Sequence, residues 1–450
     1  MSAWTKTKLA QLALALVVTA ASSVAQQAGA PELTLDEAIQ QAIANNSSLK
    51  TAGLDTLRAA DNLGATRTKR FASTQVIALG GQLLTKPSFT FQKGALGTYP
   101  STGPIPSTNI TTEIARKPAG AVYAFVAQPL STQYKLHLQL RALALGLQAT
   151  RQDEEKTRLE VVDEVRRAYY AVVEAQSTLD SLEASLPYYV ESQRLAGENL
   201  KRETVLESDL LGSEAQLLKT KNAVKDAEDQ VATACERLND LMGRDIHTQF
   251  RVASISNADS ELETPEAMEA QALQNRPELK KAKLQVQQAD FDARAKKAEY
   301  IPDVSLAFNY FTTAGLENAL PSNIAVAGMS VNWEPWDWGR KRQEYAERRA
   351  KEEQAKVAVG ATERSVLIET RNALRSLESA RRQLASADAT ERTARQRLNE
   401  VQEQVKREAV LSRVLFQAQS DLASADSQQQ QALAAFWKAR ADLKKAIGEE

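Results

Sequence analysis

Lys201-Arg-Glu-Thr-Val-Leu206 recurs later in the chain as Lys406-Arg-Glu-Ala-Val-Leu411, with five identities in six positions. An earlier pair of segments behaves in the same way. Residues 33–50, which begin Leu-Thr-Leu-Asp-Glu-Ala, match residues 262–280, which begin Leu-Glu-Thr-Pro-Glu-Ala. Matches that keep the same order in both halves of a chain indicate an internal duplication. The sequence therefore predicts that one structural unit is present twice.

The two predicted repeats span residues 33–245 and 264–447, and a polar connector at 246–263 joins them. Each begins with a short helix whose start carries a capping signal. This signal is Thr34-Leu-Asp-Glu37 in the first repeat and Thr264-Pro265 in the second. Asn46 and Asn275 are expected to interrupt these helices, and a second helix follows each interruption.

Two strands are expected next in each repeat, because apolar residues begin to alternate with small or polar ones. The alternation is clearest at Val304, Leu306, Phe308 and Tyr310. The predicted strands lie at about 74–84, 121–130, 302–312 and 323–334.

The last of these strands changes the parity of its apolar positions near Gly328, from Ile324 and Val326 to Met329 and Val331. Such a change is typical of a β-bulge. In the first repeat, residues 85–117 separate the two strands. This segment is rich in Gly, Pro, Ser and Thr, so we expect a long surface loop with no core of its own.

A long helical hairpin is predicted after each pair of strands, over about 138–240 and 340–446. The spacing of its apolar residues averages about 3.4, which favours left-handed supercoiling against a neighbour. A helix over 138–198 would be roughly 90 Å long, and Pro187 marks a place where it could kink. The hairpin turns coincide with the repeated six-residue stretches.

Composition excludes several classes of function. The chain has 450 residues with 56 Lys+Arg and 57 Asp+Glu, a net charge of −1 that gives no field for nucleic acid. With only Cys235, His137 and His247, an internal disulfide is impossible and a Cys/His zinc site is not expected. No phosphate-binding loop or loop-defined carboxylate pair is present. We therefore expect no enzyme activity, no cofactor and no metal.

The first residues resemble a secretory signal peptide. Lys6 and Lys8 precede an apolar run of about thirteen residues, and Ser23-Val24-Ala25 fits a cleavage site. The alternative is a membrane anchor, but a spanning helix needs about 20 residues. We expect residues 1–25 to be removed, and since no Cys follows the run, the chain is not expected to be a lipoprotein.

An exported chain with four membrane strands must oligomerise. Transmembrane barrels begin at eight strands, and an open sheet edge is not tolerated in lipid. A dimer would supply eight strands and a trimer twelve. Because eight strands leave an interior filled by side chains, a conduit favours the trimer. The predicted fold is thus α+β and mainly α, with a twelve-stranded barrel on a periplasmic helical tunnel.

These features together resemble the TolC-type outer-membrane efflux family. The resemblance rests on the paired Leu-x-x-x-Glu-Ala openings, on Tyr300-Ile-Pro-Asp303, on Trp336-Asp-Trp-Gly-Arg-Lys-Arg342 and on Val205-Leu-Glu-Ser-Asp-Leu-Leu211. It covers essentially the whole chain after the leader. It implies a homotrimeric outer-membrane channel that works with a periplasmic adaptor and an inner-membrane transporter, in efflux or type I secretion.

The chain also departs from the family pattern. Glu203 and Glu408 stand at the hairpin turns, where relatives commonly have glycine. The acidic ring of relatives would fall on Val414 and Gln417. Only Asp209 matches a family aspartate near the closed end, so the resemblance implies a gating role for it alone.

Two groups of residues are candidate functional sites. Trp333, Trp336 and Trp338 would anchor the barrel at the membrane interface, or alternatively pack in a core where barrel and helices meet. The hairpin turns would dock an adaptor, or alternatively their apolar pairs would pack inward. The predicted docking residues are Lys201, Arg202, Val205, Leu206, Lys406, Arg407, Val410 and Leu411.

The sequence as a whole favours a passive outer-membrane exit channel. The alternative is a periplasmic coiled-coil adaptor or scaffold of an envelope transport complex. Such an adaptor would need one helical hairpin flanked by small β domains, whereas this chain carries two hairpins and four alternating strands.

Overall fold

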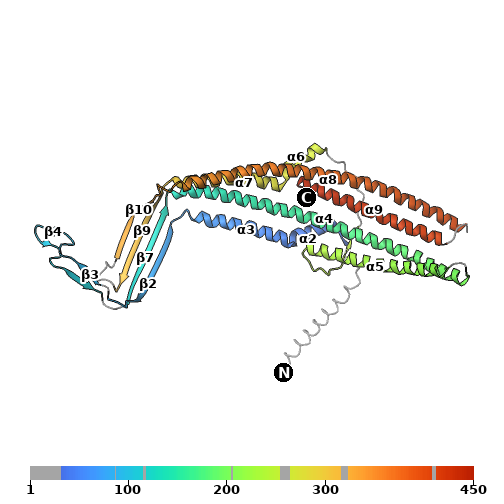
Figure 1. Ribbon diagram of the computed structural model, residues 1–450, viewed down its shortest axis with the longest axis horizontal. Coiled ribbons are helices and arrows are strands. Elements are labelled where there is room, and N and C mark those ends of the chain that lie inside the picture. Colours follow the sequence, from blue (N-terminus) through green and yellow to red (C-terminus); the bar gives the residue numbers. More distant parts are fainter. Residues whose placement is uncertain are drawn as a thin grey trace, which may run out of the picture. The chain divides into compact units, whose positions relative to one another are not determined.

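The computed structural model describes residues 32–86, 88–114, 118–203, 206–253, 264–315, 323–407 and 412–449. The expected signal peptide, residues 1–25, lies outside this range, as does most of the connector. Figure 1 shows long helices and a small sheet, so the predicted mainly helical α+β class is confirmed.

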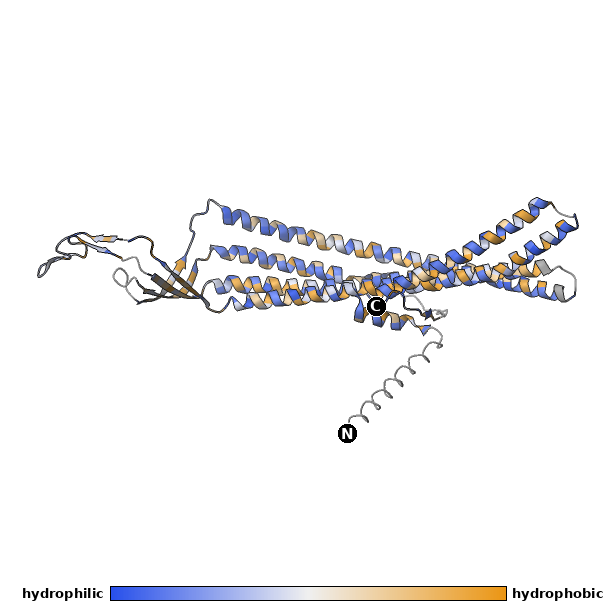
Figure 2. Cartoon of the chain, turned by 90° about the horizontal axis from the view of Figure 1, so that it is seen from below, coloured by the Kyte–Doolittle hydropathy of each residue, from blue (hydrophilic) through white to orange (hydrophobic). Residues whose placement is uncertain are grey.

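The chain divides into two compact units, and each takes segments from both sequence repeats. The sheet unit consists of Asp55–Arg151 and Lys281–Gly360. The helical unit consists of the described residues up to Leu54, of Gln152–Lys280, and of the described residues from Ala361 onward. The division falls within long helices, which carry interleaved polar and apolar residues (Figure 2).

The main sheet of the sheet unit has four antiparallel strands in the order β10-β9-β7-β2. Each repeat contributes one hairpin, and the pairing of β7 with β9 joins them. The strands are β2 (Ser73–Gln82), β7 (Pro118–Pro129), β9 (Asp303–Ala314) and β10 (Asn323–Asn332).

The bulge expected near Gly328 is absent. The β9–β10 ladder advances one residue on each strand for every step, from Asn323 opposite Thr312 to Asn332 opposite Asp303. The apolar residues of β10 therefore lie on both faces of the sheet. The change of parity reflects two groups of apolar residues on opposite faces of the sheet. The sequence of a single strand looks the same in this case as in the case of a bulge.

The segment between β2 and β7, predicted as a loop, contains two small antiparallel ladders. β3 (Ser88–Phe91) pairs with β6 (Ile110–Glu113), and β4 (Thr98–Tyr99) pairs with β5 (Gly103–Pro104). The hydroxyls of Thr90 and Thr111 lie 2.9 Å apart across the first ladder. Its strands are too short for alternation to stand out from the surrounding Gly, Pro and Ser.

The helices that open each repeat begin at the predicted caps. Thr34 and Glu37 form the capping box of α2 (Leu35–Asn45), and the Thr264 hydroxyl accepts a hydrogen bond from the Ala267 N–H at the start of α6 (Pro265–Asn275). The interruptions fall at Asn46 and Arg276. Arg276 precedes Pro277, and a residue before proline disfavours helical backbone. The helices that follow are α3 (Ser47–Thr68) and α7 (Pro277–Lys297), which a 3₁₀ turn at Ala298–Tyr300 extends.

Two long helices follow each hairpin of the sheet. They are α4 (Thr132–Lys201) with α5 (Glu207–Leu241), and α8 (Arg340–Lys406) with α9 (Ser412–Ile447). α4 begins six residues before the predicted start and is continuous through Pro187. The coiled-coil character predicted for these helices is confirmed.

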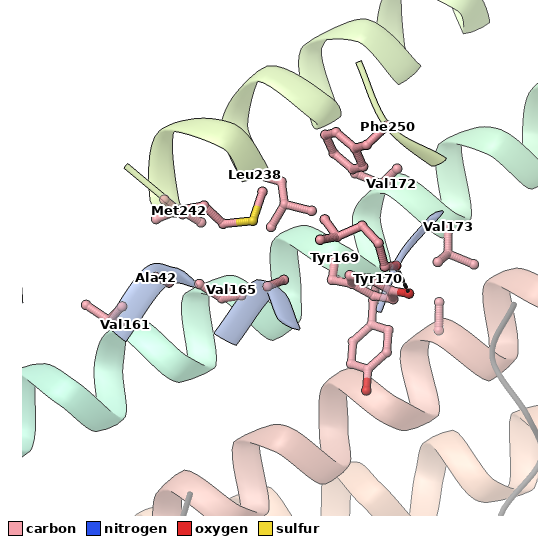
Figure 3. Packing of buried hydrophobic residues seen from close by; sticks show 14 residues of the cluster. Ala42, Val161, Val165, Tyr169, Tyr170, Val172, Val173, Leu238, Met242 and Phe250 are labelled. Atoms are coloured by element: carbon pink, nitrogen blue, oxygen red, sulfur yellow. Dashed lines mark hydrogen bonds between the residues drawn. The ribbon is translucent and has the colours of Figure 1, made fainter. Parts of the chain in front are cut away.

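The core of the helical unit packs α2, α4 and α5 together. Figure 3 shows Ala42 of α2, Val165 and Tyr169 of α4, and Leu238 of α5 converging. The Tyr169 hydroxyl lies 3.1 Å from the Leu33 carbonyl oxygen and 3.2 Å from that of Ala253, so it bridges β1 (Glu32–Leu33) and the residue after β8 (Arg251–Val252). A second cluster packs α6 against α8 and α9 in the same way.

The duplication is visible in matched contacts of the helical unit. The Asn46 side-chain amide donates to the Leu241 carbonyl oxygen (2.9 Å), and the Arg276 guanidinium donates to the Lys445 carbonyl oxygen (2.9 Å). Gly243 adopts φ +65° against Asn45, and Gly448 adopts φ +80° against Asn275. Each repeat thus closes its last helix onto its first with equivalent residues.

Ion pairs join the two repeats within the helical unit. The nearly buried Asp163 of α4 accepts from Arg167 (3.1 Å) and from Lys445 of α9 (3.1 Å), and Arg167 also contacts Asp442 of α9. Burial raises the pKa of the Asp442 carboxyl. These contacts hold α4 of the first repeat against α9 of the second.

Candidate functional site

One face of the four-stranded sheet is compatible with lipid. Side chains alternate between faces along a strand, and residues paired in register share a face. We call one side the valine face. Apart from polar residues toward the strand ends, it carries aliphatic and aromatic side chains and has no Asp, Glu, Lys or Arg within the strands. Its central residues are Val76, Ala78, Val122, Ala124, Val126, Leu306, Phe308, Ala325, Ala327 and Met329.

The other side, which we call the serine face, is polar near the helices. Ser73, Ser305 and Ser330 lie there, and a hollow of about 620 Å³ opens against them with lining residues from all four strands. Asp303 is the one charged residue of this face within the strands, and its carboxylate accepts from Lys135 (2.6 Å). The hollow lies at the helix end of this face, where Thr68, Lys69, Phe71, Ala72 and Thr132 complete its lining.

The sheet has two open edges among the described residues. β2 pairs only with β7, and β10 pairs only with β9. Each edge leaves a row of backbone N–H and C=O groups without a strand partner, which is a template for pairing with another chain. The two edges come from different repeats and run antiparallel to each other. The β10 edge of one copy can therefore pair with the β2 edge of the next without breaking the antiparallel order.

Three tryptophans follow β10, and all are exposed in the protomer. The exposed fractions are 60% for Trp333, 72% for Trp336 and 90% for Trp338, and the last two rings meet edge to face at 5.8 Å. Within a single protomer these three rings are not packed into a core. Their surface is available to a medium or partner outside the chain.

The segment that carries these rings is held by polar contacts. The Asp337 carboxylate accepts from the backbone N–H groups of Gly339 (3.1 Å) and Lys341 (3.0 Å), which lowers the pKa of that carboxyl. Glu334 accepts from Arg340 (2.6 Å). Trp338 itself is in the left-handed region at φ +56°, a conformation that disfavours any residue with a Cβ. The contacts of Asp337 hold the backbone on both sides of Trp338.

The hairpin turn between α4 and α5 is exposed. Lys201, Arg202 and Leu206 are exposed, Leu206 by 72%. Glu203 has φ +58°, a left-handed conformation that glycine adopts more readily than other residues. At the second turn Arg407 is exposed. Val205, Val410 and Leu411 lie outside the described residues, as does the side chain of Lys406.

Asp209 has a local partner in the protomer. Its carboxylate accepts from the backbone N–H of Leu206 (3.1 Å) and so caps the start of α5. Its gating role, which the family resemblance implies, stays a prediction. In the second repeat, the Gln417 side chain donates a hydrogen bond to the Asp421 carboxylate (2.7 Å). Asp421 lies one turn beyond Gln417, where the acidic ring was expected, and the family resemblance did not point to it.

The described residues do not assemble a metal centre. No group of three or more His, Cys, Asp or Glu that could hold a metal ion occurs among them. Cys235 and His247 line a hollow of about 810 Å³ in the helical unit, where burial raises the pKa of the Cys235 thiol. His137 and His247 are exposed. Within the described part of the chain, no helix has an apolar stretch long enough to cross a bilayer.

One feature of the site could not be read from the sequence. Ile77, Tyr123, Phe311 and Ile324 come from four strands and form one cross-strand row on the serine face. Each looks like an ordinary apolar strand residue. Only the pairing register, which single-strand alternation does not contain, places them side by side.

Comparison with known proteins supports the family resemblance. Residues 270–449 match the family described as outer membrane efflux protein. An uncharacterized protein of Haemophilus influenzae is 22% identical over 204 residues, which cover 43% of this chain and 44% of that protein. The chain thus aligns with less than half of this relative's length.

Solved structures share the fold over almost the whole chain. The Campylobacter jejuni CmeC outer membrane channel is 18% identical with a TM-score of 0.73, covering 92% of this chain and 85% of that one. The Vibrio cholerae outer membrane protein VceC is 13% identical with a TM-score of 0.70, covering 92% and 96%. The open state of the Neisseria gonorrhoeae MtrE outer membrane channel is 18% identical with a TM-score of 0.68, covering 92% and 89%.

Proposed function

We propose that this chain is a passive exit channel of the Gram-negative outer membrane. Two findings support the proposal: residues 270–449 match the outer membrane efflux protein family, and the fold is that of solved outer-membrane channels. It conducts substrates that an inner-membrane transporter and a periplasmic adaptor deliver, in efflux or in type I secretion. In this proposal, a leader at residues 1–25 directs export.

The sheet carries this proposal. Its valine face has no charge within the strands, its serine face carries polar residues beside a hollow, and its two edges have no strand partner among the described residues. Unpaired edges cost several kcal/mol per backbone group in hydrocarbon. Joining copies edge to edge removes that cost. Three copies give twelve strands, which is enough to enclose an aqueous interior.

The other parts take their places in this assembly. The tryptophans after β10 anchor the barrel at the interface with outer-membrane lipid. The segment with β3 to β6 joins two membrane strands and lies at the outer surface. The six hairpin turns of a trimer lie at the periplasmic end of the tunnel. Near-identical turns from both repeats give an almost sixfold rim, which suits six copies of an adaptor hairpin.

Cross-linking between strand edges tests the proposal. In a Cys235→Ala background, Ala78→Cys on β2 is combined in turn with Ala325→Cys, Ala327→Cys and Met329→Cys on β10. All four positions share the valine face. Within one chain three strand spacings separate β2 from β10, about 14 Å, whereas a disulfide requires Cα atoms within about 7 Å. Any disulfide must therefore join two copies.

At least one pair is expected to yield cross-linked dimers and trimers on a denaturing gel after oxidation in outer membranes. Ala78→Cys with Val326→Cys serves as the control, because Val326 lies on the opposite face and should give no product. Absence of cross-linking for all three valine-face pairs, in protein that fractionates with outer membranes, would contradict edge-to-edge assembly.

A further inference from the structure

The four-residue row on the serine face is continuous across the sheet. Ile77 pairs with Tyr123, Tyr123 pairs with Phe311, and Phe311 pairs with Ile324, so every strand contributes one large side chain to a row along the hydrogen-bonding direction of the sheet. We call this set the apolar row. Phe125 and Val326 add two more large apolar residues at the next level toward the helices.

The row contrasts with the rest of its face. One further level toward the helices, the paired residues are Ser73, Ala127, Ala307 and Gly328, all of them small. The following level contains Ser305 and Ser330. The serine face is therefore small and polar near the helices and bulky and apolar farther along, while its valine counterpart is apolar through the middle of the strands.

Contacts within the face hold Tyr123 of the row in place. The Tyr123 and Phe125 rings are stacked, with centroids 6.5 Å apart. The Tyr123 hydroxyl donates to the Asn309 side-chain oxygen on the neighbouring strand (2.6 Å). This hydrogen bond ties the Tyr123 ring to the neighbouring strand and so fixes its position on the serine face.

The polarity of the two faces decides which medium the row meets. The interior of a conducting transmembrane barrel is polar, and the serine face carries Asp303, Ser305 and Ser330 beside the hollow. The valine face, which has no charge within its strands, is then the lipid face. The apolar row is consequently directed into the lumen and not into the bilayer.

We propose that the apolar row forms a hydrophobic collar inside the barrel, an inference that rests on the proposed trimeric channel. Four side chains from each of three copies give twelve, in three rows that run obliquely around the lumen because the strands of a closed barrel tilt. Eight-stranded barrels are already filled by their side chains, so three rows of large residues narrow a twelve-stranded barrel. An apolar constriction resists hydrated ions by dewetting. The collar therefore limits ion leakage through the exit duct while amphiphilic molecules pass against its surface.

Thiol labelling tests the orientation. In a Cys235→Ala background, Ile77→Cys and Phe311→Cys report on the row, and Val76→Cys and Phe308→Cys are matched neighbours on the valine face. A charged, membrane-impermeant thiosulfonate is applied to trimers in liposomes. Labelling is expected at Ile77→Cys and Phe311→Cys only. Labelling of the valine-face positions, with the row protected, would overturn the collar.

Conductance tests the constriction. The doubly truncated variant Tyr123→Ala/Phe311→Ala is expected to raise single-channel conductance in planar bilayers by about twofold or more, because a wider and wetter lumen admits more ions. The matched variant Leu306→Ala/Phe308→Ala truncates the valine face and should leave conductance unchanged. Trimer content is checked on native gels for both variants. A row variant that forms trimers with unchanged conductance would overturn the proposal.

Failure of the inference and failure of the proposed function are distinguishable. If the unaltered protein forms no trimer and no pore, the channel itself is wrong. If the unaltered protein forms conducting trimers but the reagent labels the valine-face cysteines, only the collar is wrong. The same holds if truncating the apolar row leaves the conductance unchanged.

Discussion

Gly243 ends α5 in a conformation that other residues adopt at a cost. Its φ is +65°, and a Cβ placed on it would lie 2.7 Å from the Asn45 carbonyl oxygen. Gly243→Ala is therefore expected to destabilise the helical unit by more than about 1 kcal/mol. Chemical denaturation of the detergent-solubilised protein, followed by circular dichroism, measures this. Gly64→Ala is the control, since Gly64 lies exposed within α3 with open space around it, and alanine there should stabilise by up to about 1 kcal/mol. Equal effects of the two substitutions would contradict the packing described.

Tyr170 gives the helical unit a dependence on alkaline pH. Burial raises the pKa of its phenol to about 12, above the ordinary value of 10.0. Between these values the unfolded chain has lost the proton and the folded chain keeps it, so stability falls as pH rises through this window.

Tyr170→Phe should lose less stability than the unaltered chain between pH about 10 and about 12. Thermal unfolding at a series of pH values measures the difference. Tyr188→Phe, which alters a half-buried tyrosine of the same helix, serves as a control for the substitution. A Tyr170→Phe profile that runs parallel to the unaltered one would show that the folded state does not favour the neutral phenol.

At the scale of single elements, the α4–α5 turn carries the proposed adaptor contact. Leu206 is exposed in the protomer, so Leu206→Asp removes no core packing there. We expect it to reduce export sharply while the trimer stays intact, because a charge would interrupt an apolar docking contact.

Export of a fluorescent substrate and trimer content on native gels are measured separately for the Leu206→Asp variant. Leu218→Asp is the matched control, an exposed leucine twelve residues further along α5, roughly 18 Å away. Normal export by Leu206→Asp would refute docking at this turn, and loss of the trimer would favour the alternative that the turn packs inward.

The segment after β10 should contact lipid. After removal of the leader, Trp333, Trp336, Trp338 and Trp437 remain, so brominated phospholipids should quench most of the tryptophan fluorescence of reconstituted protein. A variant with phenylalanine at 333, 336 and 338 retains only Trp437, which stacks on Tyr170 in the helical unit, and should be quenched little. Equal quenching of both proteins would contradict an interfacial belt.

Helix caps and the mainly helical class could be predicted because they depend on residues close together in sequence. Thr34 and Glu37 illustrate this, since each supplies half of a hydrogen-bonded pair within four residues. The prediction of a bulge at Gly328 was wrong because a bulge depends on how two strands pair, which is not a local property of the sequence. Whether Ile324 shares a face with Phe311 depends on the register between β10 and β9. The alternation of residues along one strand gives no information about this register.

The candidate site divides in the same way. The exposed turn and the tryptophan cluster stand out as local motifs. The capping role of Asp209, the left-handed backbone of Glu203 and the apolar row depend on backbone geometry or on strand pairing. Such relations connect residues that a motif search treats as independent.

At the scale of the whole molecule, one protomer is an incomplete object. In the proposed channel, other copies cover the two edges of the sheet, and the serine face encloses a lumen only when the ring is closed. Function as a conduit therefore depends on the number of copies. A dimer would give eight strands with a filled interior, whereas a trimer gives twelve.

Native mass spectrometry of the mature protein, released from detergent micelles, measures that number directly. We expect a single species at three times the chain mass, which dissociates only under conditions that also remove the β signal in circular dichroism. A stable monomer with its full β content, or a dimer as the main species, would contradict the twelve-stranded channel.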